Sequence, residues 1–582
     1  MPRRQGTGKF WTVEPAALSD GEGRSPSWSL TSGLTPSQYE AVTASEAVLC
    51  VLAGAGAGKT RVLTLRVARR AHDGSAPARH VLAATFSRKA AGEMRRRLWT
   101  LGLGDEVEAG TFHHIALGLV KRHRLDHTAP APSVLSDRRT VLAELFGPAI
   151  GTVQLDTEIS WAKARLLSPE DYHAAAHRAL RSPTMGSERV ADLYGRYERE
   201  RRHRRLLDFD DLLWSAADLL EHDPQFASAV RWRFRHAYVD EMQDLNPAQF
   251  RLLRAVVGDE PDLCAVGDPN QSVYGWNGAD PSLIDRLPSI FPGTRVVRLD
   301  ENHRCTPQVV AVASAALGLD ASVGEEPGDG TGRPGGCAPV STRPDGPVPR
   351  FIEHTTDAAE AGWVARQVWL AHQPMRRWRR IAVLARTNAQ LLPIAAALAA
   401  ERVPYRFAGR EWEPRGDLEL GTGDDAGDLD GWGDGEAEDD GVVLATFHRA
   451  KGLEWPVVFV VGLSDGLVPL RSARTAAARE EERRLLYVAL TRAEEELTGS
   501  WSCYPEERDR ERGKAPRQPS PWLSAVIDTC EAFRLATQSA PADRVAAHLS
   551  AIRSQLEAAG VRRSLPSEAR PGVTSARTHA PE

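Results

Sequence analysis

One stretch, VLCVLAGAGAGKTRVLTL at residues 48–65, constrains the fold of this chain more than any other. It begins with a short apolar run, which is typical of a strand buried on both faces, and ends with a periodic apolar segment that predicts a helix. The glycine-rich turn between them can direct backbone N–H groups around a polyphosphate, and the helix N-terminus adds positive partial charge. Lys59 is placed to reach the β- and γ-phosphates, and the Thr60 hydroxyl to meet Mg²⁺. The stretch therefore predicts a nucleoside triphosphate site, although Ala53 stands where the strict pattern has glycine.

The composition leaves room for a globular enzyme of several domains and argues against other classes. The chain has 582 residues, of which 42% are hydrophobic and 26% charged. No apolar run approaches the ~20 residues of a membrane span, and the start, MPRRQGTGKF, lacks a signal-like apolar stretch. Six cysteines are scattered without a C-x-x-C pair, which argues against a zinc module or a disulfide framework. We therefore expect a cytoplasmic protein, without membrane contact or zinc.

A second chemical anchor is AYVDEMQDLNPAQ at residues 237–249, where a short β-prone run ends in two acids. An acidic pair at the carboxyl end of a strand beside a P-loop is where Mg²⁺ and an attacking water are expected. Asp240 would hold the metal, commonly through water, because Mg²⁺ gives up its hydration shell reluctantly. Glu241 would polarise the water as general base.

Amide and aromatic side chains stand near the other apolar runs. Gln271 lies just beyond LCAVGD (263–268), where an amide can sense a γ-phosphate, and Tyr274 and Trp276 offer rings on which any base can stack. Phe86 ends another run; it is either a further stacking platform or a core residue beside a solvated basic face. Gln38 lies in a helix upstream of the P-loop, and its amide suits an adenine edge.

Taken in order, these motifs resemble those of the superfamily 1A DNA helicases of the UvrD/Rep/PcrA group. The matching segments are LTPSQ, AGAGAGKT, TFSRKAAGEM, GTFHH, VDEMQD, VGDPNQSVYGWNGA, LDENHRC, LATFHRAKGLEWPVVFVVGL and EEERRLLYVALTRA. The resemblance implies an α/β fold of two RecA-like P-loop NTPase domains, with parallel sheets flanked by helices and a helical insertion, 1B, in the first. It also implies ATP and Mg²⁺ as cofactors, and ATP-driven 3′→5′ movement on single-stranded DNA with unwinding of 3′-tailed duplex DNA.

The family roles carry over motif by motif. Adenine contact falls to Gln38, Arg61 and His303, and contact with the ribose or phosphate network to Glu454. The phosphates and Mg²⁺ would be held by Gly54, Ala55, Gly56, Ala57, Gly58, Lys59 and Thr60, with Asp240 as a second metal ligand. Gln271, Arg304 and Arg492 would contact the γ-phosphate, and together with Lys59, Asp240 and Glu241 they form the expected catalytic set. The expected DNA contacts are Phe86, Thr111, His113, Tyr274, Trp276, Arg386, Asn388, Thr446 and His448.

The chain also departs from the family pattern. Motif IV places His303 where the family has a tyrosine that stacks on adenine, and Asn277 replaces an arginine expected to contact DNA. The large helical subdomain 2B is missing, because only residues 411–440 separate the two halves of the second RecA-like domain. That segment holds 13 acidic residues and one basic residue. It is either a flexible, self-repelling linker or a segment that mimics DNA or docks a partner.

These expectations divide the chain as follows. A disordered arm (1–33) precedes domain 1A (34–116 and 206–300), which is interrupted by 1B (117–205). Domain 2A (301–410 and 441–530) contains a Gly/Pro-rich loop near 320–348 and the acidic segment, and a C-terminal helix and tail follow (531–582). We expect a nucleoid-associated helicase in DNA repair, replication or recombination, with DNA-repair proteins as candidate partners. One alternative is a translocase that displaces proteins from single-stranded DNA without processive unwinding. The other is a non-enzymatic DNA-binding partner, which the intact catalytic set disfavours.

Overall fold

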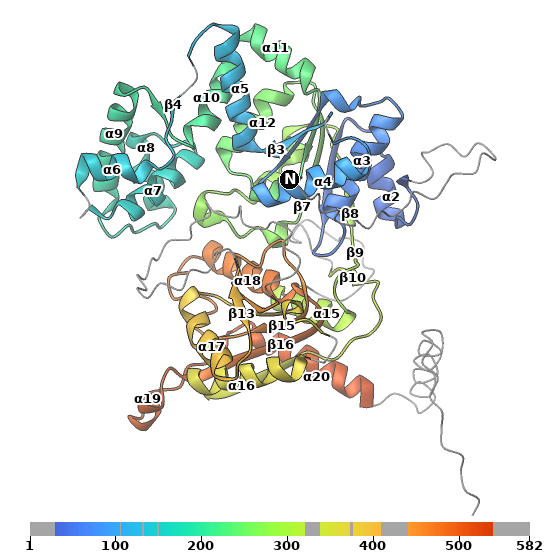
Figure 1. Cartoon of the computed structure of the whole chain (residues 1–582), viewed down its shortest axis with the longest axis vertical. Helices are drawn as coiled ribbons and strands as arrows, with labels where there is room; N and C mark the ends of the chain where they lie inside the picture. Colours follow the sequence, from blue (N-terminus) through green and yellow to red (C-terminus); the bar gives the residue numbers. More distant parts are fainter. Residues whose placement is uncertain are drawn as a thin grey trace, which may run out of the picture.

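The computed structural model describes residues 30–104, 106–130, 133–147, 150–319, 338–372, 376–408 and 440–538. Two lobes stack along the long axis of the molecule, each with one large sheet and helices packed against it (Figure 1). The predicted arm up to residue 29, the acidic segment up to residue 439 and the tail after residue 538 lie outside the described residues. The same holds for residues 320–337 of the Gly/Pro-rich loop. None of the described helices is long and apolar enough to cross a membrane.

The P-loop belongs to a six-stranded sheet of order β3-β2-β6-β7-β1-β8, in which all neighbouring strands are parallel. The predicted strand is β1 (Val48–Ala53), in which Val48 and Cys50 face one apolar core while Leu49 and Val51 face the other. This alternation is the two-residue period of a strand covered by helices on both faces. The other strands are β2 (Val81–Thr85), β3 (Glu108–Thr111), β6 (His236–Val239), β7 (Asp262–Gly267) and β8 (Arg295–Leu299).

Helices cover both faces of this sheet. One core includes residues of α2 (Pro36–Thr43), α3 (Lys59–His72) and α4 (Arg88–Thr100). The other includes residues of α5 (Phe112–Asp126), α10 (Asp211–His222), α11 (Pro224–Arg233), α12 (Pro247–Val257), α13 (Ser282–Asp285) and α14 (Leu287–Ile290). The predicted boundary between domain 1A and subdomain 1B, at residues 116 and 117, falls inside helix α5, which runs unbroken from Phe112 to Asp126. This boundary remains a proposal.

A separate helical body stands beside the first sheet (Figure 1). Its helices α6 (Arg138–Phe146), α7 (Thr152–Ala164), α8 (Pro169–Arg178) and α9 (Ser187–His203) pack around their own apolar core. A buried ionic network joins this body to the start of α10, because Lys163 Nζ lies 2.6 Å from Asp208 and 2.7 Å from Asp211. Burying a charge is costly unless the charge is paired, as these side chains are. A short parallel pair of strands, β4 (Ser133–Val134) and β5 (Leu206–Leu207), joins the segments that lead into and out of this helical body.

The second lobe contains a six-stranded sheet of order β11-β16-β15-β12-β14-β13, again with all neighbours parallel. Its strands are β11 (Arg350–Thr356), β12 (Ile381–Ala385), β13 (Tyr405–Phe407), β14 (Val442–Thr446), β15 (Trp455–Val460) and β16 (Ala493–Tyr504). Its helices are α15 (Pro307–Leu317), α16 (Asp357–Ala371), α17 (Asn388–Ala400), α18 (Ala476–Leu490), α19 (Glu507–Glu511) and α20 (Leu523–Gln538). A short parallel pair, β9 (Glu301–Asn302) and β10 (Val340–Ser341), lies on the connection between the lobes.

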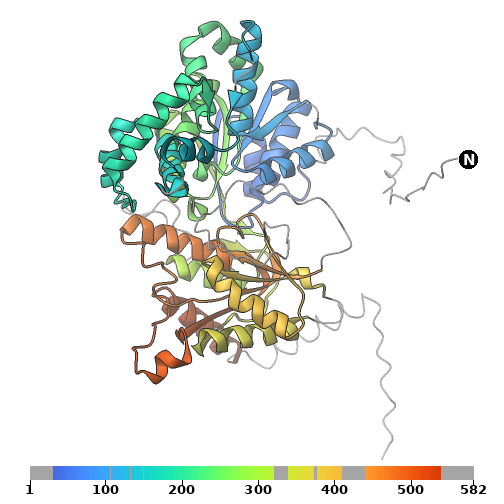
Figure 2. The same ribbon diagram turned by 60° about the vertical axis from the view of Figure 1, so that its left-hand side comes forward.

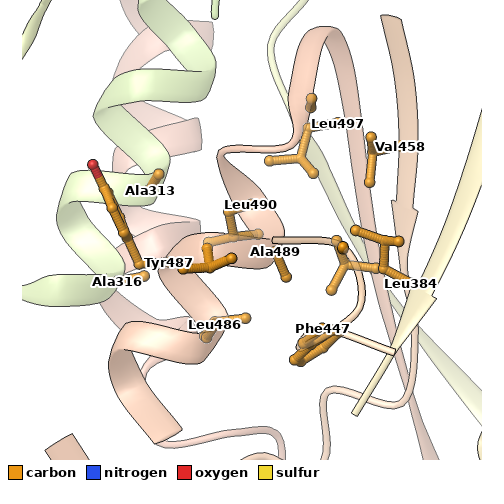
Figure 3. Packing of buried hydrophobic residues seen from close by; sticks show 14 of the residues in the cluster. Ala313, Ala316, Leu384, Phe447, Val458, Leu486, Tyr487, Ala489, Leu490 and Leu497 are labelled. Carbon is orange, nitrogen blue, oxygen red and sulfur yellow. The ribbon is translucent and has the colours of Figure 1, made fainter. Parts of the chain in front are cut away.

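Helix α18 is the element of the second lobe that lies toward the first (Figure 1 and Figure 2). Its Tyr487 lies against Ala313 and Ala316 of α15, while Leu486 and Leu490 belong to the same core as strand residues such as Leu384 (Figure 3). That core also includes Ala55 of the P-loop and Val273, which belong to the first lobe. The expected α/β architecture of two parallel sheets flanked by helices is therefore confirmed, and an apolar contact joins the two lobes beside the P-loop.

Candidate functional site

The P-loop connects β1 to α3, as the sequence predicts. Gly56 and Gly58 adopt φ angles of +70° and +81°, a region that favours glycine. A Cβ atom at Gly56 would lie 2.7 Å from Arg304 Cβ, so glycine also permits close packing against the loop after β9. Lys59 Nζ donates to the carbonyls of Ala53 (3.1 Å) and Gly54 (3.2 Å), which places an ammonium group inside the loop.

The predicted acidic pair lies directly after β6 and next to the P-loop. The Thr60 hydroxyl donates to Asp240 Oδ2 at 2.8 Å, so the two predicted metal ligands are adjacent. Burial, reinforced by the neighbouring Glu241, raises the pKa of Asp240 to about 6. A buried carboxylate beside a hydroxyl is an oxygen donor set of the kind that Mg²⁺ prefers, and a cation there would offset the cost of burying the charge. These residues therefore fit Mg²⁺.

Glu241 adopts the left-handed conformation, with φ of +55°. This conformation is uncommon outside glycine and costs roughly 1–3 kcal/mol, so a non-glycine residue held there is a candidate functional residue. The amide of Gln243 donates to Glu241 Oε2 and orients the carboxylate. Burial raises the pKa of Glu241, but Lys451 and Lys59 outweigh it and lower the pKa below its usual value. Glu241 is therefore ionised and oriented, as a general base must be.

The predicted adenine contacts meet at the end of the P-loop. Gln38 Nε2 donates to the Ala57 carbonyl at 3.0 Å and lies 3.2 Å from His303 Nε2. Gln38 Oε1 accepts from the Thr35 N–H at 3.3 Å in a capping box, so both ends of the amide are engaged. Arg61 is exposed and donates to the Gly33 carbonyl at 3.4 Å. An adenine acceptor would therefore have to replace a contact that Gln38 Nε2 already makes, whereas Oε1 keeps a second lone pair for an adenine donor.

Two arginines face the P-loop from the other side. Arg304 Nε lies 2.5 Å from Glu454 Oε2, which brings two predicted nucleotide contacts together. Arg492 is 1% exposed, and its guanidinium donates to three neutral oxygens, those of Val488 (2.9 Å), Leu453 (3.1 Å) and the Thr491 hydroxyl (3.2 Å). Burial, with Arg304 nearby, lowers the pKa of Arg492 to about 10. Among the described residues its hydrogen bonds go to neutral oxygens alone, and a buried cation without a directly bonded anion is poised to bind one.

Gln271 reaches the P-loop through a residue that the sequence analysis did not single out. Its amide donates to Asp268 Oδ2 at 2.6 Å, and the same oxygen lies 3.8 Å from Lys59 Nζ. Asp268 ends the apolar run of β7, and that position, at the carboxyl edge of a parallel sheet, was the signal available in the sequence.

Lys451 is the most consequential residue that the sequence analysis missed. It comes from the second lobe, yet its Nζ forms an ion pair with Asp244 Oδ2, donates to the Gln271 carbonyl at 2.7 Å and lies 5.0 Å from the centre of the Tyr274 ring. One side chain thus touches the segments of the first lobe that carry Glu241, Gln271 and the aromatic residues. Lys451 is the lysine of the matched segment LATFHRAKGLEWPVVFVVGL, so it was visible in the sequence, but its partners were not.

The aromatic residues predicted to contact DNA lie beside this contact. Phe86 and Tyr274 stack on each other, with ring centres 4.9 Å apart and an angle of 21° between the planes. The edge of Trp276 faces His448, with ring centres 6.4 Å apart, and the indole N–H is buried without a hydrogen-bond partner among the described residues. Burial lowers the pKa of His448 to about 3, and Arg386 and Lys451 act in the same direction.

The other predicted DNA contacts differ in how accessible they are. Asn388, at the start of α17, is exposed, whereas Thr446 is 3% exposed and its hydroxyl accepts from the Arg449 N–H. Arg386 forms a two-point ion pair with Glu482 at 2.7–3.1 Å, so a DNA phosphate would have to compete with a carboxylate. Thr111 caps α5, and His113 stacks on Phe209 at 4.0 Å. Burial lowers the pKa of His113 to about 4.

Comparisons with known proteins agree with this geometry. Residues 34–292 match the UvrD/REP helicase N-terminal domain, and residues 432–504 match the UvrD-like helicase C-terminal domain. ATP-dependent DNA helicase UvrD2 of Mycobacterium bovis is 33% identical over 586 residues, which span 85% of this chain and 82% of that protein. ATP-dependent DNA helicase PcrA of Leuconostoc citreum is 30% identical over 399 residues, which span 65% of this chain and 50% of that protein. The chain belongs to the UvrD/PcrA-like group of superfamily 1A and is an ATP-dependent DNA helicase.

Proposed function

We propose that the chain hydrolyses ATP with Mg²⁺ between its two lobes and uses each cycle to move 3′→5′ along single-stranded DNA, unwinding 3′-tailed duplexes. The observation that carries this proposal is Arg492, a buried guanidinium of the second lobe whose hydrogen bonds within the described part of the chain go only to neutral oxygens. A γ-phosphate bound by Lys59 would supply the missing negative charge. Binding of ATP would therefore draw the lobes together, and loss of the phosphate would release them.

The first lobe provides the groups that bind and activate. Lys59 would exchange its two carbonyl acceptors for phosphate oxygens, and the P-loop N–H groups would surround the β-phosphate. Thr60 and Asp240 would hold Mg²⁺, which neutralises phosphate charge when bound. Glu241, ionised and oriented by Gln243, would take a proton from the attacking water.

The second lobe provides the charge that stabilises the transition state. Arg304 and Arg492 would contact the γ-phosphate, and Arg304 would exchange its pairing with Glu454 for the phosphate. Gln271, linked to Lys59 through Asp268, would sense whether the γ-phosphate is present. Gln38, Arg61 and His303 would contact the adenine, with His303 offering a smaller ring than the tyrosine usual in the family.

DNA would bind beside the contact between the lobes. Tyr274 and Trp276 lie three and five residues after Gln271 in the chain. A shift of Gln271 on binding or loss of the γ-phosphate would therefore be passed to the stacking rings through a short stretch of backbone. Phe86, which stacks on Tyr274, extends this surface, and bases could stack there without sequence preference. Thr111, His113, Arg386, Asn388, Thr446 and His448 remain the further proposed contacts. Roles in DNA repair and association with the nucleoid also remain predictions.

Strand displacement on matched duplexes tests the proposal. The protein, titrated over a concentration series with ATP and Mg²⁺, should release a strand from a 3′-tailed duplex and not from a 5′-tailed one. A streptavidin-blocked single strand in a parallel assay reports translocation without unwinding. Streptavidin release without strand release would favour the alternative translocase function, and preference for a 5′ tail would contradict the proposed direction.

A further inference from the structure

The loop that carries Trp276 belongs to the first lobe, but side chains of the second lobe hold its backbone. Lys451 Nζ donates to the Gln271 carbonyl at 2.7 Å, and Arg484 Nε donates to the Ser272 carbonyl at 2.8 Å. Glu481 Oε1 accepts from the N–H of Gly275, the residue directly before Trp276, at 2.8 Å. Three charged side chains of the second lobe thus hold this loop of the first lobe at three backbone groups.

Two of these side chains lie on one face of α18. Glu481 and Arg484 are three residues apart, a spacing that places them side by side on a helix. The same helix continues to Tyr487, which packs in the core beside the P-loop residue Ala55. Arg492 follows two residues after the end of α18. Helix α18 therefore connects the arginine proposed to bind the γ-phosphate to the loop proposed to bind a base.

Gly275 is required for the carboxylate to approach. A Cβ atom at this position would lie 2.5 Å from Glu481 Oε2, closer than any real contact allows. Residue 275 is not among the glycines with positive φ, so its backbone conformation does not demand glycine. The absence of a side chain therefore serves the contact with Glu481 rather than the shape of the turn.

We propose that Glu481 is a positioning residue for DNA binding: by holding the N–H group of Gly275, its carboxylate sets the orientation of the adjacent Trp276 ring. Because the carboxylate moves with α18, the ring would turn with the second lobe when ATP closes the site. Glu481 would act only through Trp276 and would not touch the DNA. This inference rests on the proposed stacking of Trp276 on a base.

The central test compares Glu481→Gln, Trp276→Ala and the double variant in the full chain. The glutamine is nearly isosteric but neutral, so it replaces the charge-assisted hydrogen bond to the Gly275 N–H by a weaker neutral one. Binding of a fluorescent oligo(dT) is measured by anisotropy, together with the DNA concentration that half-maximally stimulates ATPase activity. Glu481→Gln should weaken both by about fivefold, the size expected when a charge-assisted hydrogen bond becomes a neutral one, and Trp276→Ala by about tenfold. The double variant should bind no more weakly than Trp276→Ala.

A second variant perturbs the contact between Gly275 and Glu481 by changing the glycine instead of the carboxylate. Gly275→Ala should displace the carboxylate and reproduce the loss seen in Glu481→Gln. The matched controls are Glu401→Gln, an exposed carboxylate of the second lobe, and Gly118→Ala, where an added Cβ meets no described atom within 4 Å. Both controls should bind DNA as the unmodified chain does.

Three outcomes would overturn the inference. Normal DNA binding by Glu481→Gln would do so, as would losses that multiply in the double variant. A lowered melting temperature with unchanged affinity per folded molecule would show a merely structural role. Normal binding by Trp276→Ala is a distinct result, because it would refute the proposed DNA contact itself.

Discussion

Removing the charge of Lys451 should weaken the contact between the lobes in a way that depends on pH. Its partner Asp244 is 1% exposed, and one of its carboxylate oxygens, Oδ1, has no hydrogen-bond partner among the described residues. In Lys451→Met, this carboxylate would lose the cation that compensates its burial. Breaking a buried ion pair in this way typically costs about 3–5 kcal/mol.

Protonation of Asp244 limits that cost. Burial already raises the pKa of Asp244 to about 7, against the opposing effect of Lys451, and loss of the lysine raises it further. A carboxyl group with a raised folded-state pKa binds its proton more tightly in the folded protein than in the unfolded chain. The variant therefore loses stability as the pH rises from the unfolded-state pKa to the folded-state pKa of Asp244. Lys451→Met should therefore melt closer to the unmodified chain at pH 6 than at pH 8.

A double-mutant cycle measures the coupling of the pair. Asp244→Asn removes the buried charge, so the double variant with Lys451→Met should lose clearly less than the sum of the single losses at pH 8. Thermal melting at one scan rate and protein concentration compares the four proteins. Single effects that add to within about 0.5 kcal/mol, or a melting shift equal at both pH values, would refute this account of the pair.

Further substitutions test the site one function at a time. Glu241→Gln should retain ATP and DNA binding but lower turnover by about 100-fold or more, and near-normal hydrolysis would remove Glu241 from the role of base. Lys59→Ala should instead weaken ATP binding, measured by fluorescent-nucleotide titration. Because His113 and His448 have pKa values of about 4 and 3, both are neutral from pH 6 to 8. DNA affinity should therefore show no imidazole-dependent rise toward pH 6, and a rise that His448→Gln abolishes would contradict this. Replacing residues 411–440 by a short Gly/Ser loop should leave ATPase activity and DNA affinity unchanged, since loop closure costs only ~0.6 kcal/mol per doubling of length. A salt-sensitive gain in DNA affinity would show that the acidic segment competes with DNA.

Local rules allowed much of the nucleotide site to be predicted from the sequence. The run at residues 48–52, the glycine-rich turn and the helix that begins at Lys59 are contiguous, so periodicity and glycine placement suffice to predict a P-loop. Asp240 and Glu241 could be placed beside it because the carboxyl ends of parallel strands share one edge of the sheet. The structure brings Thr60 and Asp240 to 2.8 Å, as that argument requires.

The pairings between the lobes could not be read from the sequence. Lys451 lies 207 residues from Asp244 along the chain, and Glu481 lies 206 residues from Gly275. Nothing in the local pattern of a helix distinguishes a carboxylate that accepts from a backbone N–H group of another lobe from one that faces water. Likewise, Arg386 was expected to contact DNA, and only the folded chain shows that Glu482 already holds it.

The sequence by itself determined which chemistry is present, because phosphate-binding loops and strand-end acids are built from neighbouring residues with local conformational requirements. The tertiary structure alone decided how that chemistry is connected, because ion pairs and hydrogen bonds between distant segments depend on how the lobes pack. Arg492 illustrates both the part that the sequence determined and the part that tertiary packing decided. Its motif suggested a contact with the γ-phosphate, but only packing shows a buried cation that, among the residues the structure describes, donates its hydrogen bonds to neutral oxygens.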